Sequence, residues 1–277
     1  MGPGNELCEM NHYFVWDVDP LIVQFGGIQI RWYGVLFALG IAFGFFMLEK
    51  VFAREKKQVE DVGTILTYMV FSILIGARLG HCLFYDFNYY IRHPLEILMI
   101  WRGGLASHGA FIGIITGLWI YTKRHSEETT LWLYDRIVLV AALPSALVRL
   151  GNLMNHEIVG KPTDLPWAFV FRRVDVLPRH PAQLYESVWY LITFIVLSWL
   201  YYKKDAGRRD GLLFGVFILM IFVFRFSVEF VKREQVAFER GTILNMGQAL
   251  SIPFICVGLF FVIRALKNKP QNPSFRS

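Results

Sequence analysis

The stretch VRLGNLMNHEIVG, residues 148–160, follows an almost purely apolar run from Ile137 to Leu147. Its polar side chains are Arg149, Asn152, Asn155, His156 and Glu157. Arginine binds phosphate bidentately and keeps its charge, and an amide both donates and accepts hydrogen bonds. The spacing therefore indicates a site at the end of an apolar segment rather than a plain loop.

A second pair of charges lies in FRFSVEF, where Arg225 and Glu229 fall at i and i+4 on one helical face. One interpretation is a buried salt bridge that neutralises both groups. The other is an arginine that binds a substrate phosphate while the glutamate orients it, and the two are compatible. Together with Arg149, and with Arg78 as a further candidate, this pair indicates an anionic substrate reached from within the bilayer. Phospholipid head groups are the most abundant anions of that kind.

The segment LPRHPAQLYES predicts the start of a helix, because Pro181 fits the first helical position. His180 would then be the cap residue, and the first turns would hold Gln183, Tyr185 and Glu186. A helix N-terminus presents free N–H groups that suit an anion. The alternative is a plain cap with a structural Gln/Glu pair.

The stretch WRGGLASHGAFIGIITG repeats glycine every four residues at Gly109, Gly113 and Gly117. Such a smooth face lets a neighbouring helix approach closely. His108 precedes this face, and it is interpreted either as a hydrogen-bonded structural residue or as a general base. In RWYG, Tyr33 belongs either to an aromatic belt beside the snorkelling Arg31 or to the site itself.

The composition indicates the kind of structure that positions these residues. The chain is 55% hydrophobic and only 18% charged, whereas soluble domains are about one-quarter charged. Apolar stretches long enough to cross a bilayer, about 20 residues each, recur along it. We predict an all-α integral membrane protein, a single polytopic domain with a longer outer loop at about 151–182. Its seven transmembrane helices are expected at about 26–49, 62–85, 95–121, 131–150, 183–202, 211–231 and 246–266.

Basic residues predict the orientation of these helices. One side is expected to carry Lys50, Arg54, Lys56, Lys57, Lys123, Arg124, Lys203, Lys204, Arg208, Arg209, Arg264, Lys267, Lys269 and Arg276. The other side has Arg92, Lys161, Arg172, Arg173, Arg179, Lys232, Arg233 and Arg240 over longer loops. The N-terminus is therefore expected outside and the C-terminus in the cytoplasm. The net charge of +6 follows from this topology and does not indicate nucleic-acid binding.

The N-terminal residues do not resemble a cleavable signal peptide, because they are acidic where such a peptide is basic. The three cysteines form no CxxC or Cys/His metal pattern. Whether Cys8 and Cys82 pair is left open by the sequence.

Residues 149–160 resemble the signature of the bacterial prolipoprotein diacylglyceryl transferase family. The matching positions are Arg149, Gly151, Asn152, Asn155, Glu157 and Gly160. Further resemblance lies in RWYG (31–34), GARLGHCLFY (76–85), GGLASHGAFIG (103–113), LPRHPAQLYE (177–186), FRFSVEF (224–230) and MGQALSIP (246–253). The chain departs from the family at Val148 and Leu153, where Gly and Phe are usual, and at Lys232, where an arginine is frequent.

The resemblance implies an enzyme of the bacterial inner (cytoplasmic) membrane with seven transmembrane helices. Such an enzyme moves the diacylglyceryl group of phosphatidylglycerol onto the lipobox cysteine of a preprolipoprotein, forming a thioether and releasing glycerol phosphate. Its partners would be this lipid, the signal peptide of the preprolipoprotein and the bilayer. No metal or organic cofactor is implied.

The resemblance also suggests roles for individual residues. Arg149 and Arg225 would hold the phosphate, and His108 or a neighbouring residue would accept the thiol proton. The residues expected to orient these groups or to position the head group are Glu157, Glu186, Glu229, Tyr33, Asn152, Asn155, Gly160, His180 and Gln183. His156 occupies a variable position of the motif and is not expected to be the base.

The alternative is a membrane transporter or binding protein that holds an anionic lipid, or another phosphate-bearing substrate, without chemistry. Transporters often show inverted repeats with broken helices at corresponding positions of the two halves. The sequence shows no such internal symmetry.

Overall fold

The computed structural model describes residues 13–232 and 246–268. The described chain forms two compact units, each treated by itself below. The first unit comprises residues 13–46, 138–232 and 246–268, and the second comprises residues 47–137. Two long helices, α2 (Trp32–Arg54) and α6 (Thr130–Met154), contribute to both units.

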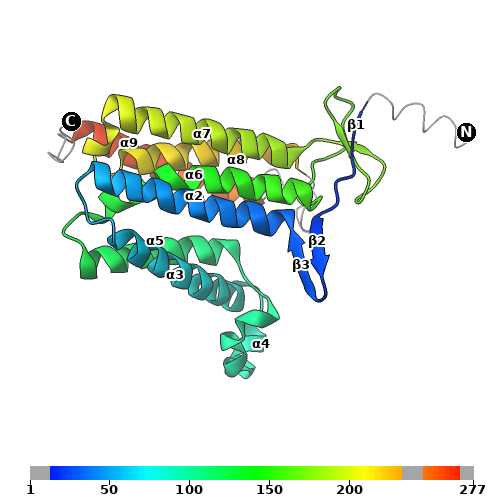
Figure 1. Ribbon diagram of the computed structural model, residues 1–277, viewed down its shortest axis with the longest axis horizontal. Helices are drawn as coiled ribbons and strands as arrows, with labels where there is room; N and C mark the ends of the chain where they lie inside the picture. The colour runs from blue at the N-terminus through cyan, green and yellow to red at the C-terminus, as the bar shows by residue number, and fades with distance from the viewer. Residues whose placement is uncertain (1–12, 233–245, 269–277) are drawn as a thin grey trace, which may run out of the picture. The chain divides into compact units, whose positions relative to one another are not determined.

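The first unit is built on long apolar helices that run side by side (Figure 1). To α2 and α6 it adds α7 (Ala182–Lys204), α8 (Leu212–Val228) and α9 (Met246–Lys267). Small residues allow close packing: a Cβ on Gly40 of α2 would lie 3.0 Å from the Cα of Pro144 on α6. The Ser187 hydroxyl of α7 donates to the Ala146 carbonyl of α6 at 3.0 Å.

Short strands gather at the end of this unit where α2 begins (Figure 1). In one sheet, β1 (Phe14–Trp16) pairs in parallel with β4 (Phe169–Phe171), and β4 pairs antiparallel with β5 (Pro178–Arg179). β2 (Leu21–Phe25) and β3 (Ile28–Arg31) form a hairpin that leads directly into α2.

The hairpin corrects the predicted start of the first span. Residues 26–31 are a turn and a strand, so the helix begins at Trp32 and not near residue 26. The physical reason is the Gly26–Gly27 pair, because Gly26 has φ +55°, a conformation that a two-residue hairpin turn requires.

In the second unit, α3 (Asp61–Phe84) packs closely on α5 (Ser107–His125). A Cβ on Gly76 would lie 2.8 Å from the Cα of Gly113, and one on Gly80 would lie 2.7 Å from the Cα of Gly109. The predicted smooth glycine face is thus confirmed as a helix-packing surface.

The predicted span at 95–121 is wrong at its start, because α5 begins only at Ser107. The preceding chain forms α4 (Phe87–Arg92) and two 3₁₀ turns, η2 (Pro94–Leu98) and η3 (Ile100–Arg102). Gly103 and Gly104 follow with φ of +82° and +69°, which interrupts any continuous helix.

Arg78 is committed to this irregular segment and not to an anion. It is buried, and its Nε donates to the Ile97 carbonyl at 2.9 Å while Nη1 donates to the Gly103 carbonyl at 2.6 Å. Nη1 also reaches the Gly104 carbonyl at 3.3 Å, and Nη2 donates to the Glu96 carbonyl. Short turns leave carbonyls without helical partners, and one guanidinium satisfies four of them.

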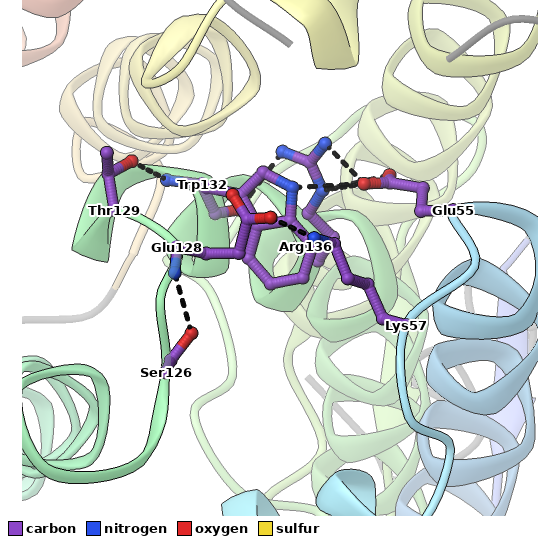
Figure 2. A network of polar contacts seen from close by, with 7 residues as sticks. All are labelled: Glu55, Lys57, Ser126, Glu128, Thr129, Trp132 and Arg136. Atoms are coloured by element: carbon purple, nitrogen blue, oxygen red, sulfur yellow. Dashed lines mark hydrogen bonds and ion pairs between the residues drawn. The ribbon is translucent and has the colours of Figure 1, made fainter. Parts of the chain in front are cut away.

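A buried ion pair that the sequence analysis missed joins the end of α2 to the start of α6 (Figure 2). Arg136 donates from Nη2 to Glu55 Oε2 at 2.8 Å and from Nε to Glu55 Oε1 at 3.0 Å. The Trp132 indole donates to the same carboxylate at 3.0 Å. Both ionic side chains are essentially unexposed. At the rim of this network, Lys57 pairs with Glu128 in a partly exposed position.

Five of the described helices are long and apolar enough to cross a membrane, namely α2, α3, α6, α7 and α9. The protein is therefore a mostly helical, multi-pass membrane protein. α8 is apolar and has 17 residues, and α5 has 19. Cys82 is buried in α3. Several residues used above lie outside the described part: Cys8, Arg233, Arg240, Lys269 and Arg276.

The buried pair predicts a stability effect. Arg136→Met should lower the free energy of unfolding by about 3–5 kcal/mol, because it leaves the Glu55 carboxylate buried without its cation. Unfolding in mixed micelles titrated with a denaturing detergent measures the change. The matched control is Lys57→Met in the same network, whose partly exposed pair should cost less than about 1 kcal/mol. Equal effects of the two variants would contradict this assignment.

Candidate active site

The motif RLGNLMNHEIVG forms one connected polar group at the end of α6. The Arg149 Nη1 donates to Asn152 Oδ1 at 3.3 Å, and the Asn152 amide donates to Glu157 Oε2 at 3.2 Å. The Asn155 amide reaches the other oxygen of Glu157 at 3.0 Å. Four of the predicted site residues are thereby brought together. The two amides fix the Glu157 carboxylate, and the Asn152 oxygen holds one edge of the arginine.

The backbone that returns Glu157 toward these amides is strained. His156 and Ile158 both have φ +57°, and for a β-branched side chain such as that of Ile158 this left-handed conformation is rare. Such strain costs on the order of 1–3 kcal/mol and persists only where the surroundings enforce it. Two contacts do so: the Glu157 N–H donates to the Asn152 carbonyl at 2.9 Å, and the buried Gln183 amide donates to the Glu157 carbonyl.

His156 has a structural environment. Its Nε2 lies 2.9 Å from the Val18 carbonyl oxygen, and its ring packs edge-on against Phe171. The side chain is buried. The ring is therefore placed by packing and by this contact, and its exclusion as the base remains a prediction.

Two tyrosines lie beside the arginine. A Cβ on Gly151 would fall 2.7 Å from Cδ2 of Tyr33, so the missing side chain makes room for that ring two residues after Arg149. Both Tyr33 and Tyr190 lie close enough to the Arg149 guanidinium to influence its charge. The sequence analysis missed Tyr190, although it lies four residues after Glu186 on the same face of α7.

Arg149 and Arg225 are linked by a chain of alternating charges, which we call the charge chain: Arg149, Glu186, Lys232, Glu229 and Arg225. Arg149 Nε lies 3.2 Å from Glu186 Oε2, and Lys232 Nζ donates to Glu186 Oε1 at 2.9 Å. Lys232 Nζ is also 3.7 Å from Glu229 Oε1, which is 3.8 Å from Arg225 Nη2.

The burial of the charge chain decreases toward Arg225. The Glu186 and Lys232 side chains are 3% and 6% exposed, whereas that of Arg225 is 35% exposed. Ions removed from water need partners, so the alternation of signs is what allows this cluster to be buried. The predicted Arg225–Glu229 ion pair is confirmed, but the Arg225 side chain is partly exposed and not buried.

Gly160, the last fixed position of the motif, lies in a tight backbone crossing. Its N–H donates to the His180 carbonyl at 3.0 Å, and it forms an isolated bridge with Lys232. A Cβ there would lie 2.6 Å from the His180 carbonyl oxygen and 2.9 Å from that of Val231. Only glycine fits between these two segments.

The predicted start of α7 is wrong by one residue. Pro181 is the N-cap and the helix begins at Ala182, because the ψ of +69° at Pro181 is not helical. Gln183 and Glu186 lie in the first turns, as predicted. His180 contacts the Tyr185 hydroxyl at 3.3 Å, and burial lowers the pKa of His180 below its ordinary value of 6.5. The imidazole is therefore neutral at pH 7 and adds no charge for an anion.

His108 lies in the second unit, exposed in the first turn of α5. It follows the Gly103–Gly104 turn that Arg78 holds, and a Cβ on Gly104 would lie 2.6 Å from the His81 ring. Its role as the base remains a prediction. Within residues 13–232 and 246–268, no group of three or more His, Cys, Asp or Glu residues is arranged to hold a metal ion.

Comparison with known proteins adds a family match. Residues 20–264 match the model of the family described as prolipoprotein diacylglyceryl transferase. A phosphatidylglycerol–prolipoprotein diacylglyceryl transferase of Chloroherpeton thalassium is 46% identical over 94% of this chain and 97% of its own length. Proteins of the same name from Porphyromonas gingivalis and Tolumonas auensis are 44% and 41% identical, each over 92% of this chain. The alignments cover 96% and 99% of those two proteins.

The backbone crossing at Gly160 predicts a localised sensitivity. Gly160→Ala should destabilise the protein by about 1–3 kcal/mol, because the new methyl group must push apart two backbone segments. Gly34→Ala is the matched control, since a Cβ at Gly34 meets no atom within 4 Å and alanine favours the helix. Unfolding of both variants in detergent micelles measures the difference. If Gly160→Ala were as stable as Gly34→Ala, the crossing would be looser than described.

Proposed function

The chain belongs to the prolipoprotein diacylglyceryl transferase family, and from this premise we propose that it lipidates prolipoproteins. The reaction transfers the diacylglyceryl group of phosphatidylglycerol to the lipobox cysteine of the prolipoprotein. It forms a thioether and releases glycerol phosphate, which makes it the first step of lipoprotein maturation.

The charge chain is the observation that carries the proposal at the level of residues. The phosphate of the lipid is both the binding handle and the leaving group, so cations at its oxygens lower the barrier. Arg149 from α6 and Arg225 from α8 are tied into one cluster through Glu186, Lys232 and Glu229. Arginine suits this role because its planar donors match phosphate oxygens and its charge is permanent.

The chemistry needs a nucleophile from the peptide and none from the enzyme. The lipobox thiol reacts as a thiolate, which attacks the terminal carbon of the diacylglyceryl group. The carbon–sulfur bond forms while the bond between that carbon and the phosphate oxygen breaks, and the electron pair leaves with the phosphate. We assign the thiol proton to His108. Six residues are assigned to binding the head group: Tyr33, Asn152, Asn155, Gly160, His180 and Gln183. Glu157 is assigned to orienting the groups that bind the substrate.

The proposed membrane setting adds α5 and α8 to the five long apolar helices, which gives seven crossings. The N-terminus would face the periplasm and the C-terminus the cytoplasm, in a bacterial inner membrane. Within the first unit, the start of α2, the end of α6 and the start of α7 lie at one end, beside the short strands (Figure 1). An exported peptide and an outer-leaflet lipid would both reach Arg149 at that end.

Purified protein in detergent with phosphatidylglycerol and a lipobox peptide should add one diacylglyceryl group to the peptide cysteine, because these two substrates hold every atom that the reaction moves. Mass spectrometry of the peptide measures the gain, and a peptide with serine in place of cysteine is the control. If a known transferase modifies the peptide alongside and this protein does not, the proposal fails. A lipid-binding or transport role would then be favoured.

Arg149→Gln should lower kcat/KM for phosphatidylglycerol by about 10²–10³-fold, the loss expected when a preorganised donor to a developing anion is removed. The control is Arg172→Gln, because Arg172 is exposed and pairs only loosely, at 3.7 Å, with Asp17. That variant should stay within about twofold of the unmodified protein, since exposed pairs contribute little. Equal losses in the two variants would argue against a phosphate role for Arg149.

A further inference from the structure

Lys232 stands at the centre of the charge chain, although no role was predicted for it. We propose that Lys232 is a positioning residue of the transfer reaction. It shares the carboxylates of Glu186 and Glu229 with the two arginines, so that neither guanidinium is closed off by its own glutamate. This inference rests on the proposed function, because it assigns Arg149 and Arg225 to the phosphate.

The geometry at Glu186 shows how the sharing works. Each oxygen of this carboxylate faces a different cation, with Oε1 at 2.9 Å from Lys232 Nζ and Oε2 at 3.2 Å from Arg149 Nε. Since Glu186 is 3% exposed, water cannot take the place of the ammonium. Without Lys232, the carboxylate gains most by turning both oxygens to the guanidinium in a bidentate pair. The donors that should bind phosphate would then be occupied.

Lys232 also restrains its second carboxylate partner, Glu229. The Glu229 Oε1 lies between Lys232 Nζ at 3.7 Å and Arg225 Nη2 at 3.8 Å. The carboxylate is also backed by the first turn of α9, since a Cβ on Gly247 would fall 2.6 Å from Oε1. Glu229 is therefore held at 3.8 Å from Arg225 Nη2, and the Arg225 side chain stays 35% exposed.

The motif that carries Arg149 also fixes the backbone of Lys232. The Lys161 N–H donates to the Val231 carbonyl at 2.8 Å, and Gly160 bridges to Lys232 itself. The Lys232 N–H donates back to Val228 at the end of α8. The ammonium is thus located by the same segments that position the two arginines.

Charge balance gives the second reason for a cation here. The charge chain holds three cations and two carboxylates, so it keeps one positive charge in excess for an anionic phosphodiester. A neutral side chain at Lys232 would leave two cations facing two carboxylates. The Glu157 carboxylate of the motif is exposed and is held by the two asparagine amides.

The test compares Lys232→Met, Lys232→Arg and the double variant Lys232→Met/Glu229→Gln in the peptide-transfer assay. Lys232→Met should lower kcat by at least about tenfold, because misplaced reacting groups cost up to about 10²-fold. Lys232→Arg restores the cation and should regain part of that loss, because its planar fork suits one carboxylate better than two. The double variant restores the excess charge, and it should turn over at least about threefold faster than Lys232→Met if the coupling is within the usual range for contacting residues.

A second readout does not depend on turnover. Phosphatidylglycerol in detergent micelles should raise the unfolding temperature of the unmodified protein, and Lys232→Met should reduce that increase. The opposing result is that Lys232→Met lowers the unfolding temperature and changes nothing else. If kcat, measured below the unfolding temperature, and the increase in unfolding temperature with lipid both stay unchanged, Lys232 is merely structural and the inference is overturned. An unmodified protein that binds the lipid without transferring it refutes the proposed function and a role of Lys232 in transfer. A loss of binding in Lys232→Met would then show only that Lys232 keeps the arginines open to the lipid phosphate. An unmodified protein that does neither refutes both.

Discussion

The buried carboxylate of Glu186 is the interaction on which the rest of the site depends. A carboxylate that is 3% exposed is unstable there unless cations meet it, and its two partners come from different parts of the chain. Arg149 approaches from α6, and Lys232 approaches from the segment that follows α8. Satisfying one ion therefore fixes three segments relative to each other. The Asn and Glu side chains of the motif then surround an arginine whose position is already set.

The same constraint separates structural arginines from those suited to a ligand. Arg136 lies 2.8 Å from the Glu55 carboxylate and donates further hydrogen bonds to Glu55 and to the Trp132 carbonyl. Arg78 donates hydrogen bonds to four backbone carbonyls. Both guanidiniums are buried, and most of their N–H groups already have partners within the protein. Arg149 and Arg225 have looser pairs, at 3.2 Å and 3.8 Å, and side chains that are 17% and 35% exposed. Buried arginines in a sequence look alike, and the difference lies in how completely the surroundings use their N–H groups.

Local patterns predicted much of this arrangement from the sequence. Long apolar runs predicted most of the helices, the Arg225–Glu229 spacing predicted an ion pair, and the glycine repeat predicted a packing face on α5 without naming its partner. Interactions between distant residues were not predictable in that way. Glu55 and Arg136 are 81 positions apart, and Glu186 and Lys232 are 46 apart, so no local periodicity connects them. The short strands and the 3₁₀ turns before α5 were missed because hydropathy does not distinguish an apolar strand or turn from an apolar helix.

The lysine at position 232 fits the bridging geometry between two carboxylates. An ammonium is a compact charge with three donors that point in different directions, whereas a guanidinium is a planar fork suited to one bidentate partner. Lys232 serves two carboxylates, one at 2.9 Å and one at 3.7 Å, and does not lie flat against either. The strained turn at Ile158 and the glycine at 160 bring the motif close enough for its backbone to bridge to Lys232. The motif therefore acts partly through its backbone, which positions the Lys232 ammonium between the carboxylates of Glu186 and Glu229.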